Sequence, residues 1–122
     1  FTVVKNHFPK KDSGFSLLHG DFSFTNSLFD KGKVCFFDFE DSFYGEKEYD
    51  LAMIYYMEFL PKKGIIKTLD IKGYNLDKIG YYAFCIGIRK VALSKSKSQR
   101  RYRLQKLNML YNRLNKVTPE NI

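Results

Sequence analysis

Long apolar runs are absent from this sequence. None approaches the roughly 20 residues that a helix needs to cross a bilayer, and no signal peptide is visible. We therefore expect no membrane partner and a cytoplasmic location. Cysteine is scarce as well: Cys35 and Cys85 have no metal-like spacing, and both lie in apolar segments. Reduced thiols in the core are the expected outcome, ahead of a disulfide.

Apolar residues are nevertheless plentiful. Of the 122 residues, 44% are hydrophobic and 17% are aromatic, a composition typical of globular rather than disordered chains. No internal repeat divides the sequence, so we predict one domain over residues 1–122. Because the sequence begins at Phe1 rather than methionine, we expect it to be a fragment of a longer protein.

Positive charge exceeds negative charge, and the formal net charge is +8. Much of the excess follows Arg89, in Lys90, Lys95, Lys97, Arg100, Arg101, Arg103 and Lys106. Such a cluster can neutralise nucleic-acid phosphates, but no nucleic-acid motif accompanies it, and aromatic residues do not alternate with it. We favour a solvated helix face that also attracts a phosphorylated small molecule. A non-catalytic basic module that binds nucleic acid or another anionic ligand is the alternative function.

The residue pattern predicts an α+β fold in which short strands precede helices. We expect a strand at Phe15–Leu18 and then a hairpin over residues 26–39, with Gly32 in its turn. Helical periodicity begins near Glu46, and we predict that this helix ends at Pro61–Gly64.

Two further helices are predicted after this point. Asn75 is a plausible N-cap for a helix whose apolar face comprises Ile79, Tyr82, Ala83 and Ile86. A last helix near Gln99–Asn115 is expected to bury a stripe of Leu104, Leu107, Tyr111 and Leu114. Thr118–Pro119 is its predicted stop.

Three oxygen-bearing side chains follow the first strand at the spacing used in ATP-dependent phosphoryl transfer. Asp21 comes first, Asn26 lies five positions later, and Asp38 lies twelve positions after Asn26. Phosphoryl transfer needs a carboxylate that accepts the hydroxyl proton, and hard oxygen ligands that hold Mg²⁺. A hairpin brings its two ends together, so Asn26 and Asp38 are expected to face one site with Asp21.

These residues lie in segments that resemble the aminoglycoside phosphotransferase and choline kinase family of small-molecule kinases. The matching segments are Leu18–Asn26, Phe37–Ser42, Gly45 and Tyr49–Ala52. The resemblance implies ATP and Mg²⁺ as cofactors and a protein-kinase-like fold, of which this chain would be the mostly helical C-terminal lobe. In that lobe, residues 15–53 would form the catalytic and metal segment, and residues 54–122 the helical remainder.

The resemblance also implies residue roles. Asp21 would be the catalytic base, with Asn26 and Asp38 as magnesium ligands. His19 and Gly20 would organise the loop, and Gly20 stands where protein kinases have arginine, which argues against a protein kinase.

Three other carboxylates have open roles. Asp50 would accept backbone N–H groups from the loop or cap its own helix. Glu40 and Asp41 would support the metal site or line the substrate cleft, or they are ordinary surface carboxylates.

The nucleotide-binding N-terminal lobe of that family has no counterpart in the sequence before His19. The eighteen residues there contain no glycine-containing phosphate loop, no lysine-bearing strand and no helix glutamate. We expect the lobe to come from the rest of a longer protein or from another polypeptide. A relic that binds without catalysing is the third possibility. The isolated chain is expected to be inactive.

The predicted substrate is a small-molecule alcohol of the aminoglycoside, choline or sugar/amino-alcohol kind. A cationic acceptor would be received by the acidic residues Glu40, Asp41, Glu46, Glu48 and Glu58.

Overall fold

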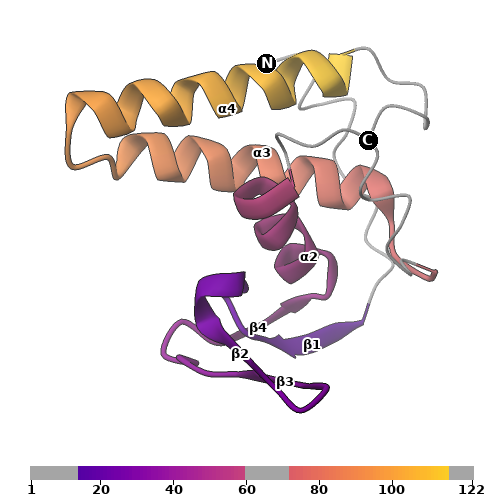
Figure 1. Cartoon of the computed structure of the whole chain (residues 1–122). Coiled ribbons are helices and arrows are strands. Elements are labelled where there is room, and N and C mark those ends of the chain that lie inside the picture. Colours follow the sequence, from indigo (N-terminus) through magenta and orange to yellow (C-terminus); the bar gives the residue numbers. More distant parts are fainter. Residues whose placement is uncertain (1–13, 60–71, 116–122) are drawn as a thin grey trace.

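Strands come first along the chain and long helices follow (Figure 1). The computed structural model describes residues 14–59 and 72–115. In chain order, its elements are β1 (Phe15–Leu18), the 3₁₀ turn η1 (Phe24–Asn26), β2 (Ser27–Asp30), β3 (Lys33–Phe36), β4 (Phe43–Glu46), α2 (Glu48–Ile54), the π-helical turn η2 (Tyr55–Phe59), α3 (Leu76–Ala92) and α4 (Lys97–Asn115). The predicted α+β class is confirmed. The assignment to a C-terminal kinase lobe and the single-domain boundaries stay predictions.

The first sheet joins β1 to β4 in an antiparallel pair, with Leu18 opposite Phe43. Strand β1 has the predicted bounds, but β4 was not expected from the sequence. A four-residue strand that contains Gly45 has little local signal, because its pairing with β1 is a long-range contact. This pairing brings the two ends of the 19–42 stretch together, and that stretch contains all three predicted site residues.

The second sheet is the predicted hairpin of β2 and β3, although it is shorter than expected. Lys31 and Gly32 both have positive φ angles, as a tight two-residue hairpin turn requires. Strand β3 ends at Phe36, so Asp38 lies two residues beyond the strand rather than at its end.

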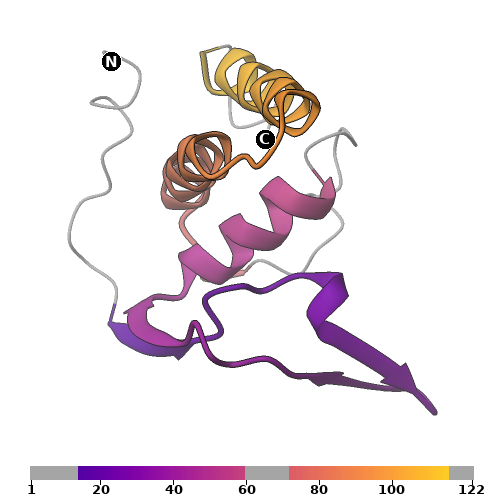
Figure 2. The same cartoon turned by 90° about the vertical axis from the view of Figure 1, so that its left-hand side faces the viewer.

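The helices form the core of the molecule. Figures 1 and 2 show α3 and α4 side by side and running in opposite directions, with α2 between them and the strands. Where these elements meet, the buried core comprises Ala52, Met53, Tyr55, Tyr56, Ile79, Ala83, Ile86, Leu110 and Leu114. The predicted apolar face of α3 is therefore largely confirmed. Asn75 caps α3 as expected, since its Oδ1 accepts hydrogen bonds from the backbone N–H groups of Asp77 and Lys78.

The predicted stripe on α4 is partly wrong. Leu114 is buried, but Leu104 and Tyr111 are 44% and 41% exposed, and Leu110 is buried instead. The buried face of α4 contains Lys106, Leu110 and Leu114, so the helix is rotated from the expected orientation. The predicted helix ends at Pro61–Gly64 and Thr118–Pro119 lie outside the described residues.

The cysteine prediction is correct only in part. Both thiols are free, but Cys35 is exposed on β3 and is therefore not a core residue. Cys85 is half-buried on α3, and burial raises the pKa of its thiol. No helix in residues 14–59 or 72–115 has the length and apolar character needed to cross a membrane.

Candidate active site

The loop that follows β1 is attached to the start of α2 by one carboxylate. The two Asp50 oxygens accept hydrogen bonds from the backbone N–H groups of His19, at 2.7 Å, and of Gly20, at 3.0 Å. Asp50 lies in the first turn of α2. Two roles were predicted for Asp50, and the one observed is the acceptance of backbone N–H groups from the loop. Because hydrogen bonds to a carboxylate are stronger than neutral ones, this contact fixes the backbone that leads into Asp21.

His19 connects that loop to the segment after β3. Its buried ring has Nε2 2.8 Å from the carbonyl oxygen of Phe37, and the backbone N–H of Asp21 donates to Nδ1 at 3.3 Å. This pattern corresponds to the tautomer in which Nε2 carries the hydrogen. The ring also contacts Phe39, with 4.5 Å between centroids. Both ring nitrogens are thus engaged, so His19 acts in this structure as a connecting group.

Gly20 sits where no larger residue fits. Its φ angle is +84°, and a Cβ atom built on it would lie 2.0 Å from the carbonyl oxygen of Asp41. The backbone of the 37–42 segment therefore passes directly over the loop. A side chain at position 20 would push the two segments apart.

Asn26 lies beside Asp21. Its amide nitrogen Nδ2 donates to the backbone carbonyl of Asp21 at 2.9 Å and to its carboxylate Oδ2 at 3.1 Å. The backbone carbonyl of Asn26 in turn accepts from the N–H of Phe37 at 3.1 Å. Asn26 thus joins the loop to the residue that precedes Asp38. Since Nδ2 faces Asp21, the opposite side of the amide presents the carbonyl oxygen Oδ1.

Asp38 has an unusual backbone conformation. Its φ angle is +64°, in the left-handed region, which non-glycine residues adopt uncommonly and aspartate more often than most. Asp38 is exposed, and its carboxylate makes no hydrogen bond or ion pair with the described part of the chain. Strained residues of this kind occur often at functional sites, where the surrounding structure fixes the direction of the side chain.

The donor set fits Mg²⁺ bound together with a nucleotide. Among residues 14–59 and 72–115, no group of three or more histidines, cysteines or acidic residues could hold a metal ion by itself. Magnesium in nucleotide sites needs only one or two protein carboxylates, because phosphate oxygens and water complete its octahedron. Asp38 and the amide oxygen of Asn26 meet that lower requirement.

The acidic residues proposed for a cationic substrate do not form one surface. Glu46 accepts hydrogen bonds from Lys78 at 2.8 Å and from Tyr82 at 2.6 Å. Glu48 is buried and accepts from the backbone N–H of Asn75. These two carboxylates are therefore structural, and that part of the expectation is wrong. Glu40 and Asp41 are both exposed at the turn before β4.

Two basic residues at the end of α3 were not assigned to the site from the sequence. Lys90 Nζ lies 3.7 Å from Asp21 Oδ1. The second basic residue, Arg89, is hydrogen-bonded to the Tyr49 phenol. Burial raises the pKa of this phenol, whereas the charge of Arg89 and its hydrogen bond lower it. The negative charge of Asp21 also raises the pKa of this phenol. No local pattern reveals these contacts, because almost seventy residues separate Lys90 from Asp21.

Comparison with known proteins identifies the family. The model of the phosphotransferase enzyme family matches residues 2–67, more than half of the chain and the whole stretch from His19 to Asp50. No curated protein gives a significant match. No solved structure does either. The chain belongs to the phosphotransferase enzyme family, and this membership indicates a phosphotransferase-type function.

Proposed function

We propose that this chain contributes the catalytic base and the magnesium ligands of an ATP- and Mg²⁺-dependent phosphotransferase whose acceptor is the hydroxyl of a small molecule. The observation that carries the proposal is the contact network around Asn26. Its side chain bonds to Asp21 at 2.9 and 3.1 Å, and its backbone carbonyl bonds to the residue before Asp38. A base and two metal ligands on neighbouring segments are what an in-line transfer requires.

In this proposal Asp21 orients the acceptor hydroxyl and accepts its proton through a carboxylate oxygen. Asn26 Oδ1 and the Asp38 carboxylate would hold Mg²⁺, which would neutralise charge on the phosphates of ATP, the phosphoryl donor. Asp50 and His19 keep the loop and the 37–42 segment in register, so Asp21 and Asp38 stay at a fixed separation. The nucleotide-binding lobe that the reaction also needs comes from the same protein or from another chain. With ATP as donor, we propose the cytoplasm as its compartment.

The test uses the complete protein, Mg²⁺–ATP and a panel of alcohols that includes choline, homoserine, simple sugars and phosphorylated alcohols such as glycerol 3-phosphate. We expect Mg²⁺-dependent transfer to one member of the panel, and a loss of about 10²–10⁴-fold in kcat for Asp21→Ala, because a positioned general base contributes that much. Asp30→Ala is the matched control, since Asp30 is an exposed aspartate that lies nine residues further along the chain, in the β2–β3 hairpin and outside the site. If Asp21→Ala turns over as fast as Asp30→Ala, the base assignment is wrong.

A further inference from the structure

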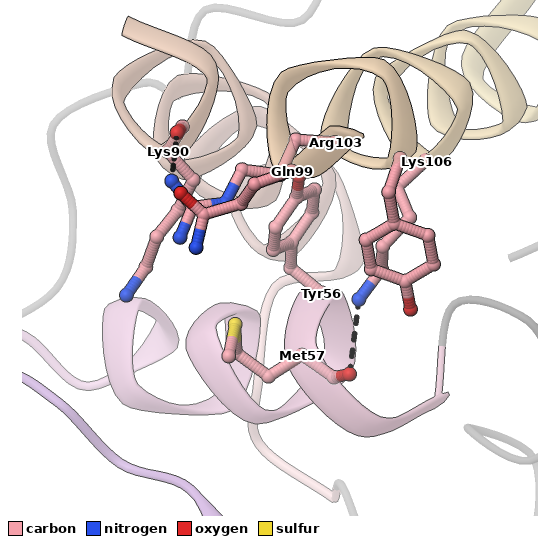
Figure 3. Close-up of a pocket in the computed structure, with 7 residues that line it drawn as sticks. Tyr56, Met57, Lys90, Gln99, Arg103 and Lys106 are labelled. Carbon is pink, nitrogen blue, oxygen red and sulfur yellow. Dashed lines mark hydrogen bonds between the residues drawn. The ribbon is translucent and has the colours of Figure 1, made fainter. Parts of the chain in front are cut away.

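A cavity of about 180 Å³ lies between η2, the end of α3 and the first half of α4 (Figure 3). It is lined by Tyr56, Met57, Lys90, Gln99, Tyr102, Arg103 and Lys106. Figure 3 shows Lys90, Gln99 and Arg103 on one side of it and Lys106 on the other. Among the lining residues that the structure describes, three side chains are cationic and none is a carboxylate. A pocket of this composition favours an anion over a cation.

Lys106 is the most unusual member of this lining. It is only 5% exposed, and burial lowers the pKa of its ammonium group. Its Nζ donates to the backbone carbonyl of Met57 at 3.0 Å and lies 4.8 Å from the Tyr56 ring centroid and 5.6 Å from that of Tyr102. The charge of Glu58 acts on Lys106, but within the described ranges no carboxylate lies within 4.0 Å of it. A buried cation without a close counter-ion gains from an anion that enters the cavity.

Arg103 is held in place by the protein itself. Its Nη1 donates to the backbone carbonyl of Lys90 and to Ser94 Oγ. These bonds fix the guanidinium against the last turn of α3. A planar guanidinium that is already immobilised presents its remaining N–H groups with little further loss of entropy, which suits the recognition of a phosphate.

The cavity adjoins the candidate active site through Lys90. This residue lines the cavity, and its Nζ lies 3.7 Å from Asp21 Oδ1. A molecule that placed an anionic group among these cations would therefore extend from the cavity toward the proposed base. The two carboxylates Glu46 and Glu48, once expected to receive a cation, are bonded to other residues.

We propose that this cavity binds a phosphate group carried by the acceptor alcohol, and that the phosphotransferase therefore acts on a phosphorylated rather than a cationic substrate. The assignment of the phosphate to the acceptor alcohol rests on the proposed function, whereas phosphate binding by the cavity does not. Lys90 and Arg103 hold the phosphate, Lys106 supplies buried positive charge behind it, and the free hydroxyl of the same molecule reaches Asp21.

The first experiment measures binding to the complete protein by calorimetry, with inorganic phosphate as the probe and no nucleotide present. We expect saturable binding that Arg103→Gln weakens by about 10-fold, because it removes a charge-assisted contact. Arg101→Gln is the matched control: it removes the same charge from an exposed position on the same helix, and we expect a change of less than about two-fold. Lys90→Gln provides a second variant that keeps the Arg103 hydrogen bonds to α3 intact.

Two results of that titration overturn the proposal: equal weakening by Arg103→Gln and Arg101→Gln, which indicates diffuse surface charge, or no binding of phosphate at all. A second titration separates the two sources of a phosphate group. With glycerol 3-phosphate and Mg²⁺–ATP as probes, Arg103→Gln should weaken only the glycerol 3-phosphate. Weakening of Mg²⁺–ATP instead assigns the cavity to the nucleotide and overturns the acceptor assignment. Phosphate binding is measured without turnover. If the phosphotransferase proposal fails, the titration therefore still tests whether the cavity binds phosphate.

Discussion

The strand half and the helical half of this molecule are stabilised in different ways. In the helical half, Ala52, Ile79 and Ala83 have no exposed surface, and their burial supplies hydrophobic free energy. In the strand half, Phe29 and Tyr44 are 76% and 77% exposed, and within residues 14–59 and 72–115 the two sheets have only two strands each. Isolated two-stranded sheets are marginally stable in water. The 19–42 stretch therefore depends on its polar contacts with α2 and on the hairpin.

This difference explains where the candidate site lies. Proton transfer and metal binding need oxygen atoms that reach solvent and substrate, which a close-packed helical core does not provide. The strand half holds those oxygens through directional hydrogen bonds, such as the ones that Asp50 accepts from the loop. Stability and chemistry are thus assigned largely to separate residues, and substitutions should separate them.

The largest expected effect on stability is in the helical half. Ile79→Ala should lower the free energy of unfolding by about 2–5 kcal/mol, because it leaves a cavity where α2 and α3 meet. Leu28→Ala on β2 removes a side chain that is 64% exposed, so it should change that free energy by less than about 0.5 kcal/mol. Urea denaturation of both variants measures the contrast. Equal losses would show that the two halves are stabilised alike.

Gly20→Ala is expected to lower the free energy of unfolding less than Ile79→Ala does, but to lower turnover more. An alanine there collides with the Asp41 carbonyl and displaces Asp21, and a displacement of about 1 Å lowers turnover by about 100-fold. Gly32→Ala is the control, since Gly32 has a similar φ of +79° but no atom within 4 Å of the new Cβ. Both variants share the backbone strain, and only Gly20→Ala has the collision. Kinetic assay of the complete protein should therefore show lost activity for Gly20→Ala alone.

The smallest expected effect concerns pH and Lys106. Burial lowers the pKa of this lysine from its ordinary 10.5, so the folded state binds fewer protons than the unfolded state between the two values. Stability should therefore rise with pH through this window, by about 1.4 kcal/mol for each pKa unit that separates the two states. Lys106→Met lacks this titration. The urea midpoint of the natural protein should therefore rise relative to that of Lys106→Met as the pH approaches 10.5. A gap that stays constant with pH would contradict the assigned burial effect.

Local signals in the sequence predicted much of the fold. The β2–β3 hairpin has a glycine turn between apolar segments, and Asn75 precedes a regular apolar face, so both features depend on near neighbours. Strand β4 was missed because its pairing with β1 spans the whole 19–42 stretch. The buried face of α4 was predicted incorrectly: it includes Lys106, whose contacts with Met57 and Tyr56 join residues remote in sequence.

The candidate site divides in the same way. The spacing of Asp21, Asn26 and Asp38 predicted a shared location, and the bonds of Asn26 to Asp21 and to the Phe37 N–H agree with that. Their chemical roles stay predictions. Spacing does not predict the left-handed backbone of Asp38. It also does not predict the contact of Asp21 with Lys90, which lies near the C-terminal end of α3. Both features depend on how the helices pack against the loop.

In the proposed function, the loop after β1 and the segment after β3 form one site with divided roles. Its most direct test is to measure turnover and Mg²⁺–ATP affinity side by side for Asp21→Ala and Asp38→Ala in the complete protein. We predict that Asp21→Ala loses turnover while its dissociation constant for Mg²⁺–ATP stays unchanged. Asp38→Ala should raise that constant by at least about 10-fold, because loss of even an outer-shell partner of a metal ligand costs about that much. Unchanged Mg²⁺–ATP affinity in Asp38→Ala, or undiminished turnover in Asp21→Ala, would contradict the claim.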